Sequence, residues 1–398
     1  MEKNFTFSAT LRIILYVLIA IGVVAIVVGF MTDTDRIWAN LLLNNFFFLS
    51  LAIGASFFMA LQYITQSGWS AAFKRIPESM MAYMPYAAVI MLVIVIFGMD
   101  SLYSWIHPED WVSPEGKKFD AHELHIIHNK ASFLNVPFFI VRLVIYFLVW
   151  IFFVRMFRKF SLAEDREGGL TYFKKSEFYS KVYIFSLALT FSMASFDLIM
   201  TIDPTWYSTI FSLKNFIAAF YHGTTIIVVI VLVMNYFGYF DFMKDAHWAD
   251  FSKYVFILSI VWAYFWFSQY LLIWYANIPE ETTYYVKRLT GDWKINFYLN
   301  LTLNWLVPFL ILLPNYFAHK KYILLIVITL VSFGQYTDLF EQIMPGTMGD
   351  FHIGFVEIGT WLGFAGLFFY IVFRTLSSKP LIPKNHPLLN ESLNHSGH

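Results

Sequence analysis

The chain has 398 residues, of which 59% are hydrophobic and only 14% are charged, and its formal net charge is zero. A soluble domain carries about 25% charged residues, so this composition predicts a membrane protein. The zero net charge gives no sign of a nucleic-acid partner. Because the chain contains no cysteine, it has no thiols with which to form a disulfide, ligate an iron–sulfur cluster or attach haem c.

Ten segments are apolar enough to cross a membrane, since a span needs about 20 apolar residues. They lie at 11–30, 38–64, 81–105, 132–157, 178–201, 214–240, 253–277, 295–318, 321–343 and 353–374. No small-residue cleavage site follows the first segment, so we expect a retained span rather than a signal peptide. The sequence therefore predicts an all-α integral membrane protein of about ten transmembrane helices.

The positive charges predict an orientation. Most of the 27 Lys and Arg residues lie in the N-terminal segment, in every second connection after it and in the C-terminal segment. Segments rich in Lys and Arg stay in the cytoplasm. We therefore expect both termini to be cytoplasmic.

Short motifs recur at a near-constant spacing. Asn45 precedes a Phe at the start of the second span and Asn215 does so in the sixth, while Asn135 and Asn304 begin similar Asn-to-Pro motifs in the fourth and eighth. These matches favour an internal repeat, although abundant Phe, Asn and Pro also produce short matches by chance. The expected organisation is an N-terminal span at 1–37, two four-helix bundles at 38–213 and 214–352, a last span at 353–376 and a disordered cytoplasmic tail at 377–398.

The segment SFDLIMTIDPTWYSTIF at 195–211 places carboxylates inside or beside an oily span. A carboxylate within the bilayer costs about 2.5–3.5 kcal/mol even on the mildest scale, which suggests a function for such residues. In the predicted orientation, the ionisable residues in or near spans gather toward the outer face. They are Asp100, Arg142, Asp197, Asp203, His222, Asp338, Glu341 and Glu357, with His107 and Glu280 at the boundary.

Such a group can take up and release protons. We expect Asp197, Asp338, Glu341 and Glu357 to be proton acceptors, Arg142 a charge partner and His222 a relay. For each residue alone, contact with interfacial water or simple neutralisation is the alternative.

Helical spacing supports two of these assignments. Gln335, Asp338 and Glu341 share one helix face. Hydroxyl side chains such as Tyr183 and Thr190 lead toward Asp197 along the fifth span. This stripe is either half of a proton path or a set of hydroxyls bonded back to helix carbonyls.

The histidines argue against haem and do not establish a metal site. Only His222 lies well inside a span, whereas haem b held between helices needs two facing histidines. The loop motif HELHIIH places His122, His125 and His128 at a spacing that could face a metal. Exposed histidines in this position are common, and we assign no metal.

Two classes of protein fit these features. An ion- or proton-coupled transporter usually binds its substrate near the midplane, between repeats. A membrane subunit of a redox complex meets a quinol or a proton path near the outer face. The off-centre polar residues favour the redox subunit.

Three stretches together resemble one known family. The run FDLIMTIDPTWYSTIF at 196–211, with LNVPFFIVR at 134–142 and KNFIAAFYHGT at 214–224, resembles the NrfD-like membrane subunits of bacterial alternative complex III. The length is similar to that of the smaller of the two such subunits. The resemblance covers essentially all ten spans and implies a respiratory quinol:cytochrome c (or oxidase) oxidoreductase in the inner membrane.

The resemblance also implies partners, cofactors and site residues. Expected partners are the larger NrfD-like sister subunit, a periplasmic iron–sulfur subunit, haem c subunits, small membrane subunits, lipid and, as a further option, a terminal oxidase. The redox centres would belong to those partners, and quinone (menaquinone or ubiquinone) is the only candidate ligand of this chain. Asp197, Asp203, His222 and Arg142 match the family's polar positions. Candidate residues for a quinone at the outer face are His107, His128 and Glu280.

Overall fold

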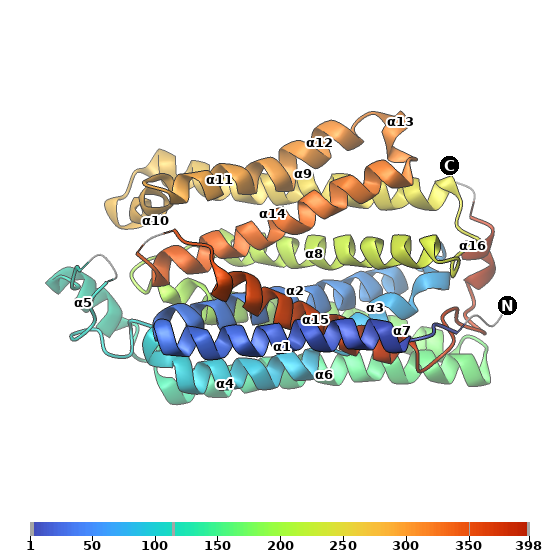
Figure 1. Cartoon of the computed structure of the whole chain (residues 1–398), viewed down its shortest axis with the longest axis horizontal. Coiled ribbons are helices and arrows are strands. Elements are labelled where there is room, and N and C mark those ends of the chain that lie inside the picture. The colour runs from blue at the N-terminus through green and yellow to red at the C-terminus, as the bar shows by residue number, and fades with distance from the viewer. Residues whose placement is uncertain (1–3, 114–115, 350, 396–398) are drawn as a thin grey trace.

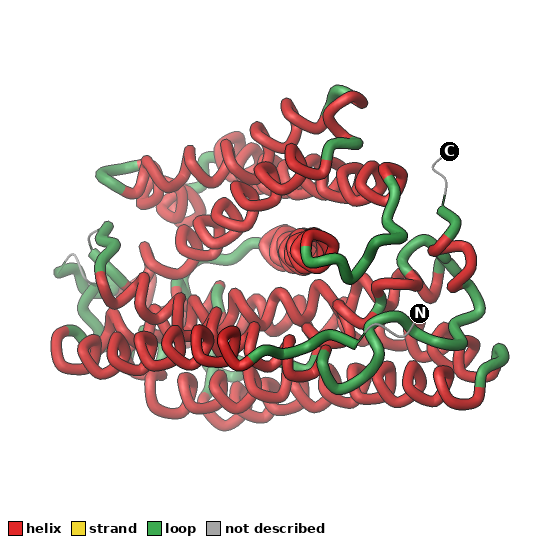
Figure 2. Tube along the Cα trace, turned by 45° about the vertical axis from the view of Figure 1, so that its right-hand side comes forward, coloured by secondary structure: helices red, strands yellow, loops and turns green. Residues whose placement is uncertain are grey.

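The computed structural model describes residues 4–113, 116–349 and 351–395. Ten helical segments in these ranges are long and apolar enough to cross a membrane, and the described residues form no β-strand beyond one isolated bridge. The predicted all-α, ten-span class is therefore confirmed. Most helices run lengthwise and the loops gather at the two ends (Figures 1 and 2). We call the end with α5 and α10 the α5 end, and the end with both termini the terminal end.

The spans follow the predicted order along the chain. They are formed by α1 (Ala9–Thr32), α2 (Thr34–Ile64), α3 (Arg75–Met81) with α4 (Met84–Leu102), α6 (Val136–Glu167), α7 (Thr171–Leu198), α8 (Thr209–Tyr236), α9 (Asp245–Ala276), α11 (Trp293–Leu301) with α12 (Val307–Leu312), α14 (Lys321–Thr347) and α15 (Phe355–Leu376). The remaining helices are α5 (Ala121–Asn129), α10 (Pro279–Leu289), α13 (Asn315–Ala318) and α16 (Leu389–Leu393), with short 3₁₀ turns η1 (Ala71–Phe73) and η2 (Met200–Ile202).

Local sequence explains where the long helices begin and end. At the start of α6 the Asn135 side chain accepts a hydrogen bond from the Phe138 amide at 3.0 Å, and Pro137 occupies the first turn. A capping Asn followed by Pro is a strong helix start. The helix ends at Gly168, whose φ of 68° suits a residue without a side chain.

Helix α2 lies at the centre of the packing. It contacts α4, α7, α8, α14, α15 and α1. The α2–α8 contact is so close that a Cβ on Gly54 would overlap the backbone of Ala219, and one on Gly223 would overlap Gly54. Helices α1 and α15 approach in the same way at Gly22 and Gly363. Small residues are the usual means by which membrane helices pack this closely.

The eighth span contains a π-helical turn. Residues Thr302–Leu306 (η3) form this turn between α11 and α12, and Pro308 follows. The helical residues run without a break over Trp293–Leu312, so the single helix expected over 295–318 is present but ends before the short helix α13. The π turn widens the helix, a feature often found at functional sites.

The end of the chain packs onto the terminal end, in place of the disordered tail expected from its composition. The Ser392 hydroxyl donates to the Trp69 carbonyl at 2.6 Å and accepts from the Ala72 amide at 3.1 Å. The Ser392 carbonyl oxygen lies 3.0 Å from His247 Nε2 in α9. Residues 377–395 therefore connect the η1 region with α9.

Candidate functional site

The fourth and fifth spans are joined by a buried ion pair near the α5 end. Arg142 donates from Nε and Nη2 to the two oxygens of Asp197 at 2.9 and 2.8 Å, and the Tyr146 hydroxyl donates to the same carboxylate at 2.9 Å. The guanidinium carbon lies 3.8 and 4.2 Å from the ring centres of Phe133 and Phe138. We call Arg142 and Asp197 the arginine pair. Its bidentate geometry balances one positive charge with one negative charge.

A second buried group connects α8, α11 and α14. Lys214 Nζ donates to Asp338 at 2.8 Å. The Asn300 amide nitrogen donates both to Asp338 at 3.1 Å and to Glu341 at 2.8 Å. All four residues are buried, and we call them the acidic cluster. Glu341 forms no ion pair within the described part of the chain, so this cluster holds two carboxylates and a single lysine.

Arg288 of α10 lies beside the acidic cluster. Its guanidinium donates to the main-chain oxygens of Glu341 and Gln342 at 2.8 and 3.1 Å, and it lies 3.3 Å from the ring centre of Tyr284. Its Nη2 is 3.7 Å from the half-buried Asp203 carboxylate. Burial raises the pKa of the Tyr284 hydroxyl well above its ordinary value, so this phenol stays neutral. Arg288 is thus a second cation, between the acidic cluster and the α5 end.

Glu357, like Asp197 and unlike Glu341, forms an ion pair with an arginine. Arg36 of α2 donates to its two oxygens at 2.7 and 2.6 Å, and Asn40 adds a hydrogen bond at 3.1 Å. The Gly354 amide donates to it as well, at 2.8 Å. This pair joins α2 to α15 with balanced charge.

His222 lies inward of the acidic cluster, two turns along α8 from Lys214. Its Nδ1 is 2.9 Å from the Ser50 hydroxyl. Its Nε2 is buried without a hydrogen-bond partner in the described structure, as are both amide atoms of Gln335 and of Asn215. Buried polar atoms usually have partners, so these three side chains are the groups in this region best placed to bind water or pass a proton.

The hydroxyl stripe of the fifth span divides into two kinds of residue. Ser186 and Thr190 donate back to helix carbonyls at 2.8 Å, the local bonding that was the alternative to a proton path. Tyr183 instead turns inward, with its hydroxyl 2.6 Å from that of Ser56.

Four predicted site residues lie on the surface of the α5 end. Asp100 and His107 are exposed and 3.7 Å apart, and His122 lies 3.7 Å from the exposed Glu280. His128 is exposed too. The structure does not bring these side chains to the acidic cluster. In the described residues, no group of three or more His, Asp or Glu side chains has the geometry to hold a metal.

The candidate quinone residues lie apart from the main cavity at the α5 end of the described structure. A cavity of about 330 Å³ at the α5 end is lined by Asp33, Asp35 and Asp100 among others, but not by His107, His128 or Glu280. A quinone head group needs a mainly apolar pocket with a few converging polar groups. His107, His128 and Glu280 are exposed and absent from this lining, so they do not fit such a pocket.

Charged residues are also buried toward the terminal end, contrary to the expectation that the costly residues all gather at the outer face. Lys74 pairs with Glu164 at 2.6 Å, and Glu78 accepts from Arg75 and Arg158 at 2.6 and 2.8 Å. We call the whole set the terminal network: Lys74, Arg75, Glu78, Arg158, Glu164 and Asp165. The sequence placed these residues in cytoplasmic connections, whereas α6 continues to Glu167 and carries several of them into the bundle.

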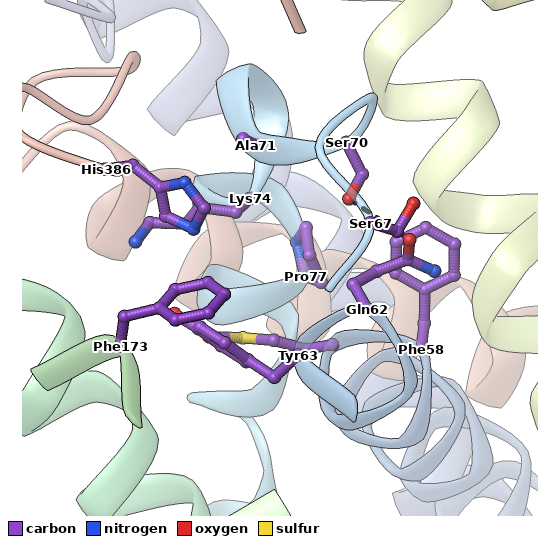
Figure 3. A pocket seen from close by; sticks show the side chains of 11 residues that line it. Phe58, Gln62, Tyr63, Ser67, Ser70, Ala71, Lys74, Pro77, Phe173 and His386 are labelled. Carbon is purple, nitrogen blue, oxygen red and sulfur yellow. Dashed lines mark hydrogen bonds between the residues drawn. The ribbon is translucent and has the colours of Figure 1, made fainter. Parts of the chain in front are cut away.

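A small cavity lies beside the terminal network (Figure 3). It measures about 20 Å³, room for about one water molecule, and Tyr63, Lys74, Phe173 and His386 line it. Burial, and then the nearby Lys74 ammonium, lower the pKa of His386 to about 2. The packed tail therefore presents a neutral imidazole to this cavity.

Two asparagines of the eighth span, at and before the π turn, contact α14. Asn304, inside the π turn, donates to the Gly334 carbonyl at 2.8 Å and to the Asn300 side chain at 2.6 Å. Sequence analysis did not identify Lys214, Asn300, Arg288 or Arg36 as site residues. For the three cations the signal was present but ambiguous, because a cation at the edge of a span is usually solvated.

These features define a multi-pass all-α membrane protein with buried, partly unbalanced charges. The chain matches no known protein-family model and no curated protein.

Proposed function

We propose that the chain is an integral membrane subunit of a bacterial respiratory quinol:cytochrome c (or oxidase) oxidoreductase, in which it provides a proton path. The unbalanced charge of the acidic cluster is the observation that supports this most directly. Asp338 and Glu341 are bridged by one amide and share one lysine. Two close buried carboxylates do not readily ionise together, so such a pair is suited to hold an exchangeable proton.

The proposed path uses groups that already neighbour one another. Asp203 and Arg288 lie between the acidic cluster and the α5 end. Beyond the cluster, Gln335 is one turn further along α14, and His222 contacts Ser50. In this proposal Glu341 and Asp338 accept the proton and His222 relays it. Asp197 and Glu357, each held by an arginine in bidentate geometry, stabilise helix contacts instead.

The redox partners belong to the same proposal. The chain has no cysteine and only one histidine well inside a span, so iron–sulfur clusters and haem c would lie in partner subunits. The stretch at 196–211 resembles the NrfD-like subunits of alternative complex III, which supports this assignment. In that arrangement the α5 end would face the periplasm and both termini the cytoplasm.

A proton- or ion-coupled transporter is the second candidate, and the π turn at Thr302–Leu306 favours it. Such turns are frequent at functional sites, and this one contains Asn304 and closely follows Asn300. The two functions differ in their partners, because a transporter needs no redox subunit.

Purification from native membranes in mild detergent distinguishes the two candidates. A tagged chain that copurifies with a c-type haem spectrum and an iron–sulfur protein supports the redox subunit. A colourless chain without partners, obtained under conditions that preserve other respiratory complexes, would overturn it and favour the transporter.

A further inference from the structure

A basic pocket opens at the terminal end between α4, α6 and α15. Its volume is about 460 Å³, and its lining includes the cations Arg158, Arg374 and Lys379. Tyr86 and Tyr370 lie in the same lining, and the Tyr370 hydroxyl accepts a hydrogen bond from that of Tyr16 at 3.0 Å. Three cations close together form a suitable environment for a phosphate diester.

The positive charge of this pocket is only partly neutralised. Arg158 pairs with Glu78 at 2.8 Å. Arg374 and Lys379 form no ion pair with any described carboxylate and are exposed. The pocket therefore retains excess positive charge, directed to the surface where α4 and α15 leave the apolar zone.

A separate apolar slot lies next to the basic pocket along α15. Its volume is about 370 Å³, and residues of α1, α2, α4 and α15 line it, Val23, Leu41, Val93 and Phe364 among them. Leu367 lines both the slot and the basic pocket. From Arg374 to Thr360 at the far end of the slot, α15 rises about 20 Å, a length comparable to that of an acyl chain. We call the two cavities together the lipid groove.

We propose that the lipid groove is a binding site for one anionic phospholipid, with its phosphate at Arg158, Arg374 and Lys379 and an acyl chain in the slot. The charge favours an anionic head group over a zwitterionic one, because the ammonium of a zwitterionic lipid would meet the same cations. The apolar slot next to the cations favours a lipid over free phosphate. This site is separate from the acidic cluster and does not depend on the proposed proton path.

Native mass spectrometry of the purified full-length chain tests the head-group half of this site. After delipidation, phosphatidylglycerol and phosphatidylcholine with the same acyl chains are added at equal concentration. We expect preferential binding of one phosphatidylglycerol, and about tenfold or more weaker binding in R374Q/K379Q, since two cations near the phosphate are removed. The matched control is R155Q/K174Q, which removes two exposed cations of the same end and should bind as the unsubstituted chain does.

Filling the apolar slot with a larger side chain tests whether it binds an acyl chain. Val93→Trp should displace the lipid while leaving the cations in place, and Val141→Trp, on the exposed face of α6, is its control. Equal binding of the two lipids, or unchanged phosphatidylglycerol binding in R374Q/K379Q, would overturn the proposal. Inorganic phosphate that competes fully, together with no effect of Val93→Trp, would reduce the site to a phosphate site and overturn the lipid assignment.

Discussion

The arginine pair and the acidic cluster both hold carboxylates in buried, apolar surroundings, but they balance the negative charge in different ways. In the first, one guanidinium meets one carboxylate through two hydrogen bonds, and two phenylalanine rings enclose it. In the second, one ammonium contacts one of two carboxylates, and an asparagine amide bridges them. In the arginine pair the charges balance, and both carboxylate oxygens accept hydrogen bonds from the guanidinium. The second has a carboxylate in excess.

This difference indicates which buried charges stabilise the fold and which can do chemistry. A bidentate Arg–carboxylate pair leaves neither partner free to exchange a proton without breaking two strong hydrogen bonds. An excess carboxylate in the same apolar surroundings must be neutralised by a proton or held at high cost. The number of charged neighbours, rather than burial alone, therefore separates Glu341 from Asp197 and Glu357.

Removing the cation of the arginine pair should have the largest effect. Arg142→Gln leaves Asp197 buried with only Tyr146 as partner, and losing one member of a buried pair costs about 3–5 kcal/mol. We expect a strongly lowered melting temperature and yield in detergent. Replacing both members, as in R142L/D197L, should recover most of the loss. A single variant as stable as the unsubstituted chain would show that the pair contributes no net stability.

Removing the cation of the acidic cluster should cost less. In Lys214→Gln the two carboxylates can retain a proton and hydrogen-bond one another, so we expect a loss of about 1–3 kcal/mol, typical of a broken buried hydrogen bond. The loss should grow between about pH 6 and about pH 8, because higher pH opposes the bound proton. The Arg142→Gln loss should also grow with pH, because Asp197 then lacks its cation, and it should remain the larger of the two losses. Equal, pH-independent losses in the two variants would remove the distinction between the two sites.

A third and smaller effect is expected at His386, which is a buried titratable group beside the Lys74 cation. Its pKa lies far below its ordinary value owing to burial, so the released tail binds a proton that the packed tail does not. The stability of tail packing is thus complete above about pH 6.5 and falls by about 1.4 kcal/mol for each unit below it.

Hydrogen exchange and limited proteolysis of residues 377–395 measure that effect. We expect faster exchange at about pH 5 than at about pH 7 after correction for intrinsic rates, and a weaker pH dependence in His386→Leu. His319→Leu, which changes a partly buried histidine outside the tail, serves as the control. A tail whose protection rises on acidification would contradict the assignment.

The fold was largely predictable because its signal is local. Each span carries its own apolar run, and cues such as Asn135 with Pro137 mark a helix start without reference to the rest of the chain. The carboxylates and Arg142 could be identified for the same reason, since a charge inside an apolar run is conspicuous in sequence.

Their partners could not be predicted with equal success. Lys214 and Arg36 lie where a span meets its connection, and sequence alone does not tell whether such a side chain reaches water or turns inward. Arg288 lies on a separate short helix, and only the tertiary fold brings it to Glu341. Packing of the tail depends on contacts such as Ser392 with Trp69, which lie 323 positions apart.

The most direct test of the central claim is the infrared difference spectrum of the purified chain between high and low pH. We expect the C=O stretching band of a protonated carboxylic acid to appear on acidification, to be lost or shifted in Glu341→Gln, and to persist in Asp197→Asn. This result would place the exchangeable proton in the acidic cluster. A band that Glu341→Gln leaves unchanged and Asp197→Asn abolishes would contradict the account.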